Sequence, residues 1–145
     1  LRDFGNVTKG DIGGYIESEK NLSQDGNAWV SGDACVYGNA CVSGNARVYG
    51  DACVYGNARV YVDAWVSGDA DIKTTGDICS MSGFGSEYRT TTAFRTKNGD
   101  VHVSCGCFQG NLEAFCQRVE STHGNNLYGR EKMIEMLKIH FEVEP

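Results

Sequence analysis

The chain has 145 residues, enough for one compact unit or for a repeat array with a small cap. Its 13 basic and 19 acidic residues give a net charge of −6, which argues against broad non-specific binding to nucleic acid. No apolar run approaches the length of a membrane span, and no signal peptide is recognisable. The seven cysteines are an odd number scattered through regular elements, so we expect reduced thiols in a cytoplasmic protein.

Residues 1–25 lead into a strict six-residue repeat and are expected to form an N-terminal cap and a first irregular coil. The open first edge of a repeat array needs a cover, and Phe4 and Tyr15 are suitable aromatic residues. Ile16 and Leu22 fall in phase with the alanine position of the repeat. The coil is therefore expected to begin before residue 26.

Eight six-residue units run from residue 26 to residue 73 without insertion, each with an alanine third and an aliphatic residue fifth, as in Ala28 and Val30. A period of six excludes an amphipathic α-helix, whose apolar positions recur every 3.6 residues. In a strand, side chains two apart point the same way, so the alanine and the valine face inward. Glycine followed by Asn or Asp supplies a corner. Residues 26–79 are thus expected to form a mainly β solenoid.

Three sides of six residues would close a triangular coil, so residues eighteen apart should stack at about 4.8 Å. The pattern resembles the left-handed parallel β-helix of hexapeptide-repeat proteins, here with about three coils. Stacking places Trp29, Arg47 and Trp65 in one outward column. We expect this column and the nearby Tyr49 to meet another subunit of a homotrimer or a multiple of three. A ligand platform and simple local stacking are the alternatives.

Residues 80–145 are expected to form a small α+β cap with the order ββαα, docked on the last coil. Asn98-Gly99 favours a two-residue hairpin turn, which pairs Arg95 with His102 and Phe94 with Val103. Asn111 should cap a helix that runs to about Thr122, where Gly124 ends it. A second helix is expected over about 129–141, with its apolar residues inward: Ile134, Leu137 and Phe141.

The two-residue turn also predicts one polar hairpin face, carrying cations and hydroxyls that suit an anionic ligand such as a phosphate. Its members are Arg89, Thr91, Arg95, Lys97, His102 and Ser104. The alternative is an ordinary solvated face.

Catalytic signals are weak, because the repeat contains no histidine. The three histidines are all in the C-terminal part: His102, His123 and His140. Neither the histidine base of hexapeptide acyltransferases nor the three zinc ligands of γ-carbonic anhydrases is present on the coil. Cys-x-Cys at residues 105–107 is a poor zinc spacing, so Cys105, Cys107 and Cys116 are expected to be core thiols. We expect no metal, no cofactor and no enzymatic activity.

The run DIGGYIESEKNLSQD ahead of the repeat resembles the start of hexapeptide-repeat proteins that are frequent in bacteriophages and prophages. Residues 83–140 also look like the C-terminal part of those proteins. Those proteins have no settled enzymatic activity. Together with the missing catalytic residues and the cationic hairpin face, the resemblance leads us to expect a phage or prophage binding protein that antagonises host defence. It would sequester a phosphate-bearing nucleotide signal or a host defence protein. An acyltransferase-like enzyme and a purely structural solenoid are the alternatives.

Overall fold

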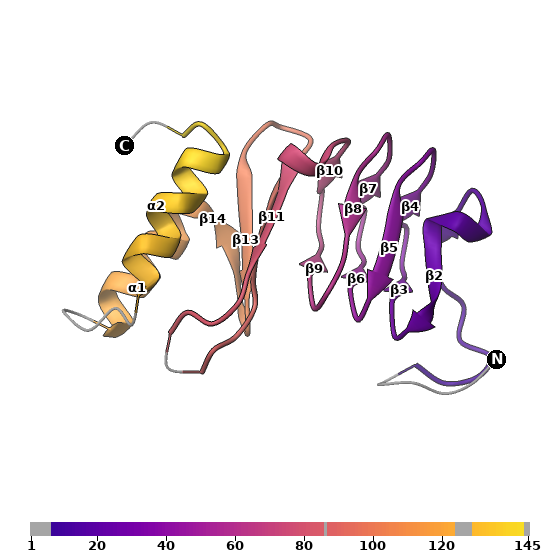
Figure 1. Cartoon of the computed structure of the whole chain (residues 1–145), viewed down its shortest axis with the longest axis horizontal. Coiled ribbons are helices and arrows are strands. Elements are labelled where there is room, and N and C mark those ends of the chain that lie inside the picture. Colours follow the sequence, from indigo (N-terminus) through magenta and orange to yellow (C-terminus); the bar gives the residue numbers. More distant parts are fainter. Residues whose placement is uncertain (1–6, 86, 124–128, 144–145) are drawn as a thin grey trace.

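The computed structural model describes residues 7–85, 87–123 and 129–143. A parallel β-solenoid of about three turns occupies the N-terminal part, and a four-stranded antiparallel sheet and two helices follow it. Figure 1 shows the coils stacked along the long axis, with the C-terminal sheet standing between the solenoid and the helices. The expected mainly β solenoid with an α+β cap is therefore confirmed.

The solenoid has three parallel sheets, one for each side of the coil. The first contains β1 (Tyr15–Ile16), β4 (Cys35–Val36), β7 (Cys53–Val54) and β10 (Asp71–Ile72). The second contains β2 (Leu22–Gly26), β5 (Cys41–Gly44) and β8 (Arg59–Val60), and the third β3 (Trp29–Val30), β6 (Arg47–Val48) and β9 (Trp65–Val66). The predicted outward column is confirmed, because Arg47 pairs with Trp29 on one side and with Trp65 on the other.

The interior of the solenoid is built from the alanine and aliphatic positions of the repeat. All eight pairs, from Ala28 to Ile72, are at most 5% exposed. Backbone groups bond along the axis, as when the Trp29 amide donates to the Ala46 carbonyl at 3.0 Å. Burial of each valine side chain contributes about 1.5–3 kcal/mol to the stability of the fold. The axial hydrogen bonds pair the buried backbone N–H and C=O groups, which would otherwise be costly to bury.

The corners depend on a positive φ, which glycine provides at no steric cost. Gly44 has φ 67° and Gly50 has φ 73°. Val62 occupies the equivalent corner of its unit with φ 61°, although its side chain is β-branched and 51% exposed. A β-branched residue in this region is a genuine outlier, so the corner at Val62 is strained.

The first coil is longer than the others. Ile16 pairs with Val36 and Leu22 with Val42, whereas Gly26 pairs with Gly44 after a register irregularity. The prediction that Ile16 and Leu22 are in phase with the alanines is therefore wrong, because a bulge adds two residues and moves them to valine positions. Asn21, in the 3-10 turn η1 (Glu19–Asn21), is fully buried and donates to the Gly38 and Ala40 carbonyls of the next coil.

After the solenoid and the 3-10 turn η2 (Thr75–Asp77), the C-terminal sheet has the order β11 (Ile78–Met81), β12 (Thr91–Arg95), β13 (Val101–Cys105) and β14 (Phe108–Asn111). The predicted hairpin corresponds to β12 and β13. The outer strands β11 and β14 were not predicted, because β11 lies in a stretch rich in serine and glycine and β14 is short.

The hairpin register is one residue away from the prediction. Its loop has three residues: the Thr96 amide donates to the Asp100 carbonyl at 3.0 Å, and Gly99 adopts φ 83°. Phe94 therefore pairs with His102 rather than Val103, and Arg95 with Val101 rather than His102. An Asn-Gly pair fits this longer loop as well as the two-residue turn, so the turn sequence does not select the register. The register is selected by which side chains of the hairpin are buried.

One face of β12 and β13 covers the end of the solenoid, as expected for a docked cap. Phe94 is fully buried and joins the solenoid core together with Ile72 and Ile78. The Trp65 amide donates to the Thr92 hydroxyl at 3.2 Å, and the Lys97 amide donates to the Asp69 carbonyl at 3.0 Å. An aromatic ring thus closes the core, while hydrogen bonds satisfy the last exposed strand edge.

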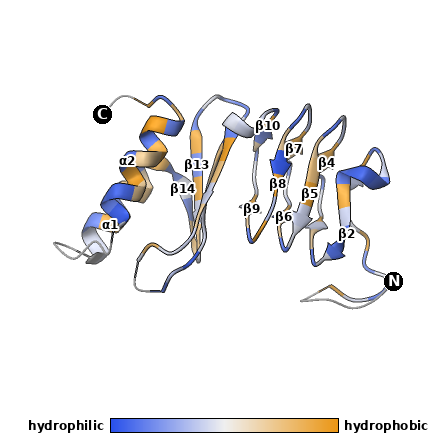
Figure 2. Cartoon of the chain, in the orientation of Figure 1, coloured by the Kyte–Doolittle hydropathy of each residue, from blue (hydrophilic) through white to orange (hydrophobic). Residues whose placement is uncertain are grey.

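The opposite face of the sheet packs against α1 (Leu112–His123) and α2 (Arg130–His140). The Asn111 side chain caps α1 by accepting from the Ala114 amide at 2.8 Å, as predicted. In α2 the fully buried residues are Met133 and Leu137, while Ile134 is only half-buried. Figure 2 shows apolar and polar residues alternating around both helices. The predicted helix end at Gly124 lies outside the described residues.

Substituting Val62→Gly should stabilise the protein by about 1 kcal/mol, because glycine relieves the corner strain and little buried surface is lost. Urea denaturation measures the change. The matched control is Gly50→Val, which should destabilise, since a Cβ there would lie 2.9 Å from the Gly68 amide nitrogen. A Val62→Gly protein less stable than the wild type would contradict the strain.

Substituting Phe94→Ala should cost about 3–5 kcal/mol, because the solenoid core would lose its aromatic cover. Thermal unfolding followed by circular dichroism measures the loss. Phe108→Ala is the control, since Phe108 is only half-buried and lies against the helices. Equal losses for the two variants would show that Phe94 is not special to the coil end.

Candidate functional site

The six residues predicted to share one polar face are divided between the two faces of the sheet. Thr91 and Arg95 lie on the helix side, whereas His102 and Ser104 lie on the solenoid side. The prediction of a single cationic face is wrong, because it followed from the two-residue turn. Each member has a separate environment.

Arg95 joins the hairpin to the C-terminal end of α2. Its guanidinium donates to the Gly99 carbonyl at 2.8 Å and to the Phe141 carbonyl at 2.5 Å, and it lies 5.3 Å from the centre of the Phe141 ring. The Arg95 guanidinium is therefore engaged in contacts that stabilise the fold. Thr91, at the other end of β12, is buried, and its hydroxyl donates to the Cys105 sulfur at 3.1 Å.

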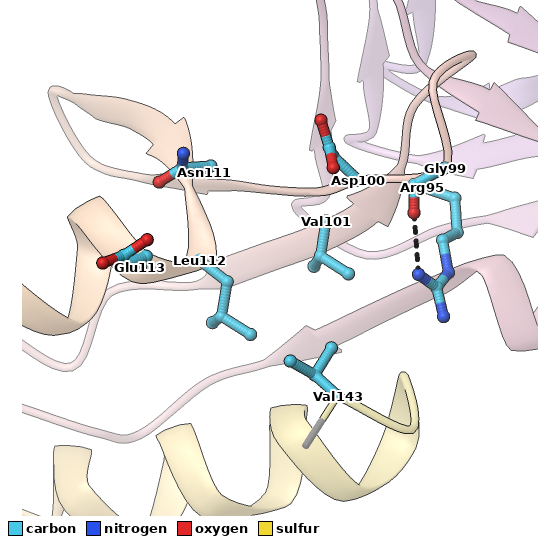
Figure 3. Close-up of a pocket in the computed structure, with 8 residues that line it drawn as sticks. All are labelled: Arg95, Gly99, Asp100, Val101, Asn111, Leu112, Glu113 and Val143. Carbon is cyan, nitrogen blue, oxygen red and sulfur yellow. Dashed lines mark hydrogen bonds between the residues drawn. The ribbon is translucent and has the colours of Figure 1, made fainter. Parts of the chain in front are cut away.

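A cavity of about 370 Å³ adjoins Arg95, and we call it the Arg95 pocket. Val101, Leu112 and Val143 point toward one another across it, and the dashed line in Figure 3 marks the bond from Arg95 to Gly99. Asp100 and Glu113 stand at its border. The lining offers an apolar centre with charges of both signs around it, and no anion is specifically favoured.

Lys97 and His102 hold the sheet on the solenoid. The Lys97 ammonium donates to the Asp51 carbonyl at 3.0 Å. His102 stacks on Phe94 with 5.4 Å between ring centres, and its burial lowers the pKa of the imidazole, while the nearby Asp69 carboxylate opposes that shift. Both residues thus contribute to docking.

Arg89 and Ser104 do come together, in a pocket of about 220 Å³ between the last coil and the C-terminal sheet. We call it the Trp65 pocket. Its lining residues come from the corner before β9, from β9, from β12 with the segment before it, and from β13 with the turn after it. They are Asp63, Trp65, Arg89, Thr90, Thr92, Ser104 and Gly106.

The indole of Trp65 and the guanidinium of Arg89 are the two accessible large groups of this pocket. Trp65 is 43% exposed and meets Tyr49 edge-on, with 6.3 Å between ring centres. Arg89 lies 3.7 Å from the Glu87 carboxylate, and both side chains are more than half exposed. A Cβ at Gly106 would stand 2.5 Å from an Arg89 nitrogen, so the guanidinium lies directly against this glycine.

Asp63 ends a row of corner side chains that bond along the solenoid axis. The Asn27 amide donates to the Asn45 oxygen at 3.3 Å, and the Asn45 amide donates to the Asp63 carboxylate at 3.0 Å. The row holds one Asp63 oxygen in place. The carboxylate is therefore positioned at the Trp65 pocket by residues one and two coils away.

The predicted interface column is only partly exposed. Trp29 and Arg47 are half-buried, and a Cβ at Gly13 would lie 3.3 Å from the Trp29 ring, so the N-terminal segment passes close to it. The Tyr49 hydroxyl accepts from the Gln109 side chain at 2.7 Å. All four predicted interface residues are described, and Trp65 is the most exposed of them at 43%, whereas the other three are half-buried.

Sequence reasoning missed Asp63, Thr90, Thr92 and Gly106 as members of the site. Nothing in the local sequence marks Thr90, Thr92 and Gly106, because they come together with Trp65 only when the sheet docks on the coil. The outward phase of Trp65 and the corner position of Asp63 were the available signals.

The cysteines show no metal-binding arrangement. Cys105 and Cys116 pack in the core between sheet and helices as predicted, but Cys107 is exposed, because it lies in the turn after β13 rather than on the strand. Within residues 7–85, 87–123 and 129–143, no group of three or more His, Cys, Asp or Glu side chains is placed to hold a metal ion. None of the helices in these ranges is long and apolar enough to span a membrane.

Comparison with known proteins supports the solenoid. A family described as YdcK Beta solenoid repeat matches residues 40–55 and 52–68, which lie within the repeat. No curated protein and no solved structure matches the chain. The family match therefore covers part of the coil only.

Stability should depend on pH through His102. The fold favours the neutral imidazole, so its lowered pKa contributes stability that is fully present above the ordinary value of 6.5 and is lost as the pH falls from that value through the lowered pKa. His102→Gln should therefore lose less stability than the wild type between pH 8 and pH 5, measured by urea denaturation at both values. An unchanged pH dependence would contradict the assignment.

Proposed function

We propose that the protein is a non-enzymatic binding protein that takes a phosphate-bearing nucleotide in the Trp65 pocket. The observation that carries this proposal is that an exposed indole and an exposed guanidinium line the same pocket. An indole presents a flat face on which a base stacks. A guanidinium donates two parallel hydrogen bonds to a phosphate.

The remaining lining groups support an orientation for the ligand. Thr90 places a half-buried hydroxyl at the pocket, where it can donate to phosphate or ribose oxygens, while Thr92 and Ser104 are nearly fully buried in its wall. The Asp63 carboxylate repels a phosphate and accepts hydrogen bonds from ribose hydroxyls or a base amino group. The phosphate is therefore assigned to Arg89, and the ribose or base to the side nearer Asp63.

Binding without turnover is the better proposal for this pocket. Among the described residues that line it there is no histidine, cysteine or lysine, and Asp63 is the one carboxylate. The acyltransferase alternative needs a base on the coil, and the repeat supplies no histidine. A purely structural solenoid needs no accessible indole beside a guanidinium.

The proposed cellular role rests on the resemblance to phage and prophage hexapeptide-repeat proteins. In that role the protein antagonises host defence by sequestering a nucleotide signal. We further propose a homotrimer that uses the face of β3, β6 and β9, because the exposed Trp65 lies on that face and beside the pocket. A neighbouring subunit there would cover the pocket and slow ligand release.

Arg89→Ala should weaken binding of adenosine monophosphate by at least about tenfold, because a charge-assisted hydrogen bond contributes about 1.5–3 kcal/mol. Trp65→Ala should weaken it as well, by removal of the stacking surface. Isothermal titration calorimetry measures both.

The control is Arg118→Ala, which changes an exposed arginine on α1 that lines neither the Arg95 pocket nor the Trp65 pocket. Wild-type affinity in the Arg89→Ala protein would refute the nucleotide pocket and favour a protein partner instead.

A further inference from the structure

A second polar pocket lies on another side of the junction between solenoid and sheet, and we call it the Arg59 pocket. Its volume is about 220 Å³. Arg59 comes from β8, Ser80 from β11 and His140 from the last turn of α2. Tyr61 and Thr75 add two more hydroxyls, and Ile78 is nearly fully buried beneath them.

The charge of this pocket differs from that of the protein as a whole. The net charge of the chain is −6, yet the described residues that line the Arg59 pocket include no carboxylate. Arg59 is exposed and forms no ion pair or hydrogen bond with any described residue. The Cys79 thiol in the lining also stays neutral, because burial raises its pKa. The accessible charge there is an uncompensated guanidinium.

Two ring side chains, His140 and Tyr61, border the pocket. The His140 ring meets the Phe141 ring edge-on, with 4.6 Å between ring centres, and Phe141 is 2% exposed, so the imidazole rests against a fixed partner. Tyr61 is 56% exposed and directly precedes Val62, the strained corner. A corner conformation that costs stability is retained next to a pocket, as is common at binding sites.

We propose that the Arg59 pocket binds a phosphate monoester. The Arg59 guanidinium pairs with two phosphate oxygens, and the His140 ring and the Ser80 and Thr75 hydroxyls donate to the others. The exposed ring of Tyr61 packs against the organic group that carries the phosphate. The site is separate from the Trp65 pocket and does not depend on the function proposed for it.

The test uses phenyl phosphate and inorganic phosphate as probes, with binding followed by calorimetry and by phosphorus NMR. The wild type should bind phenyl phosphate more tightly than inorganic phosphate, and Tyr61→Ala should remove that preference. Arg59→Ala should weaken binding of both by at least about tenfold. Arg59→Lys should fall between, since an ammonium keeps the charge without the bidentate geometry.

Arg118→Ala is the matched control, since it removes an exposed guanidinium of α1 that lines none of the three pockets and should leave phenyl phosphate binding unchanged. The proposal is overturned if the wild type fails to bind phenyl phosphate at millimolar concentration, or if Arg59→Ala binds it like the wild type. Equal losses in the Arg59→Ala and Arg118→Ala proteins would also overturn it, because they would indicate attraction by overall charge.

Discussion

A chain that turns a corner every six residues has room inside only for small side chains, and the rest of the molecule follows from this constraint. The interior consists of alanine and valine columns, so the coil gains its cohesion from axial backbone bonds as much as from apolar burial. Such a structure cannot end abruptly without exposing both its core and a strand edge. At the C-terminal end Phe94 covers the core, and β12 supplies partners for the last coil.

The regular part of the coil is poorly suited to hold a specific ligand, because each outward position repeats the one below it. Irregular chemistry arises where the repeat stops. At the docked sheet, Trp65 of the coil lines one pocket with Arg89 and Ser104 of the C-terminal part. Arg59 of the coil lines another pocket with Ser80 and His140. Both pockets thus combine one solenoid side with groups that only the sheet and helices provide. The strained corner at Val62 lies between Tyr61 of one pocket and Asp63 of the other.

The solenoid could be read from the sequence because a strict period fixes both strand register and side-chain direction. Pairing of Trp29, Arg47 and Trp65 and burial of every alanine–valine pair followed directly. The capping role of Asn111 was also local information. The hairpin was different: one residue of loop length reversed the faces of Arg95 and His102, and only the burial of Phe94 against the coil selects the longer loop. The candidate site depended on that choice, so its membership could not be predicted.

The most direct test of the central claim is a titration of ¹⁵N-labelled protein with adenosine monophosphate, followed by amide chemical shifts. We expect the largest changes at Thr90, Thr92, Ser104 and Gly106, together with the indole N–H of Trp65, while amides at the N-terminal coil stay unchanged. Shifts confined to the Arg95 pocket, or no shifts at millimolar nucleotide, would contradict ligand binding at the junction of Trp65 and Arg89.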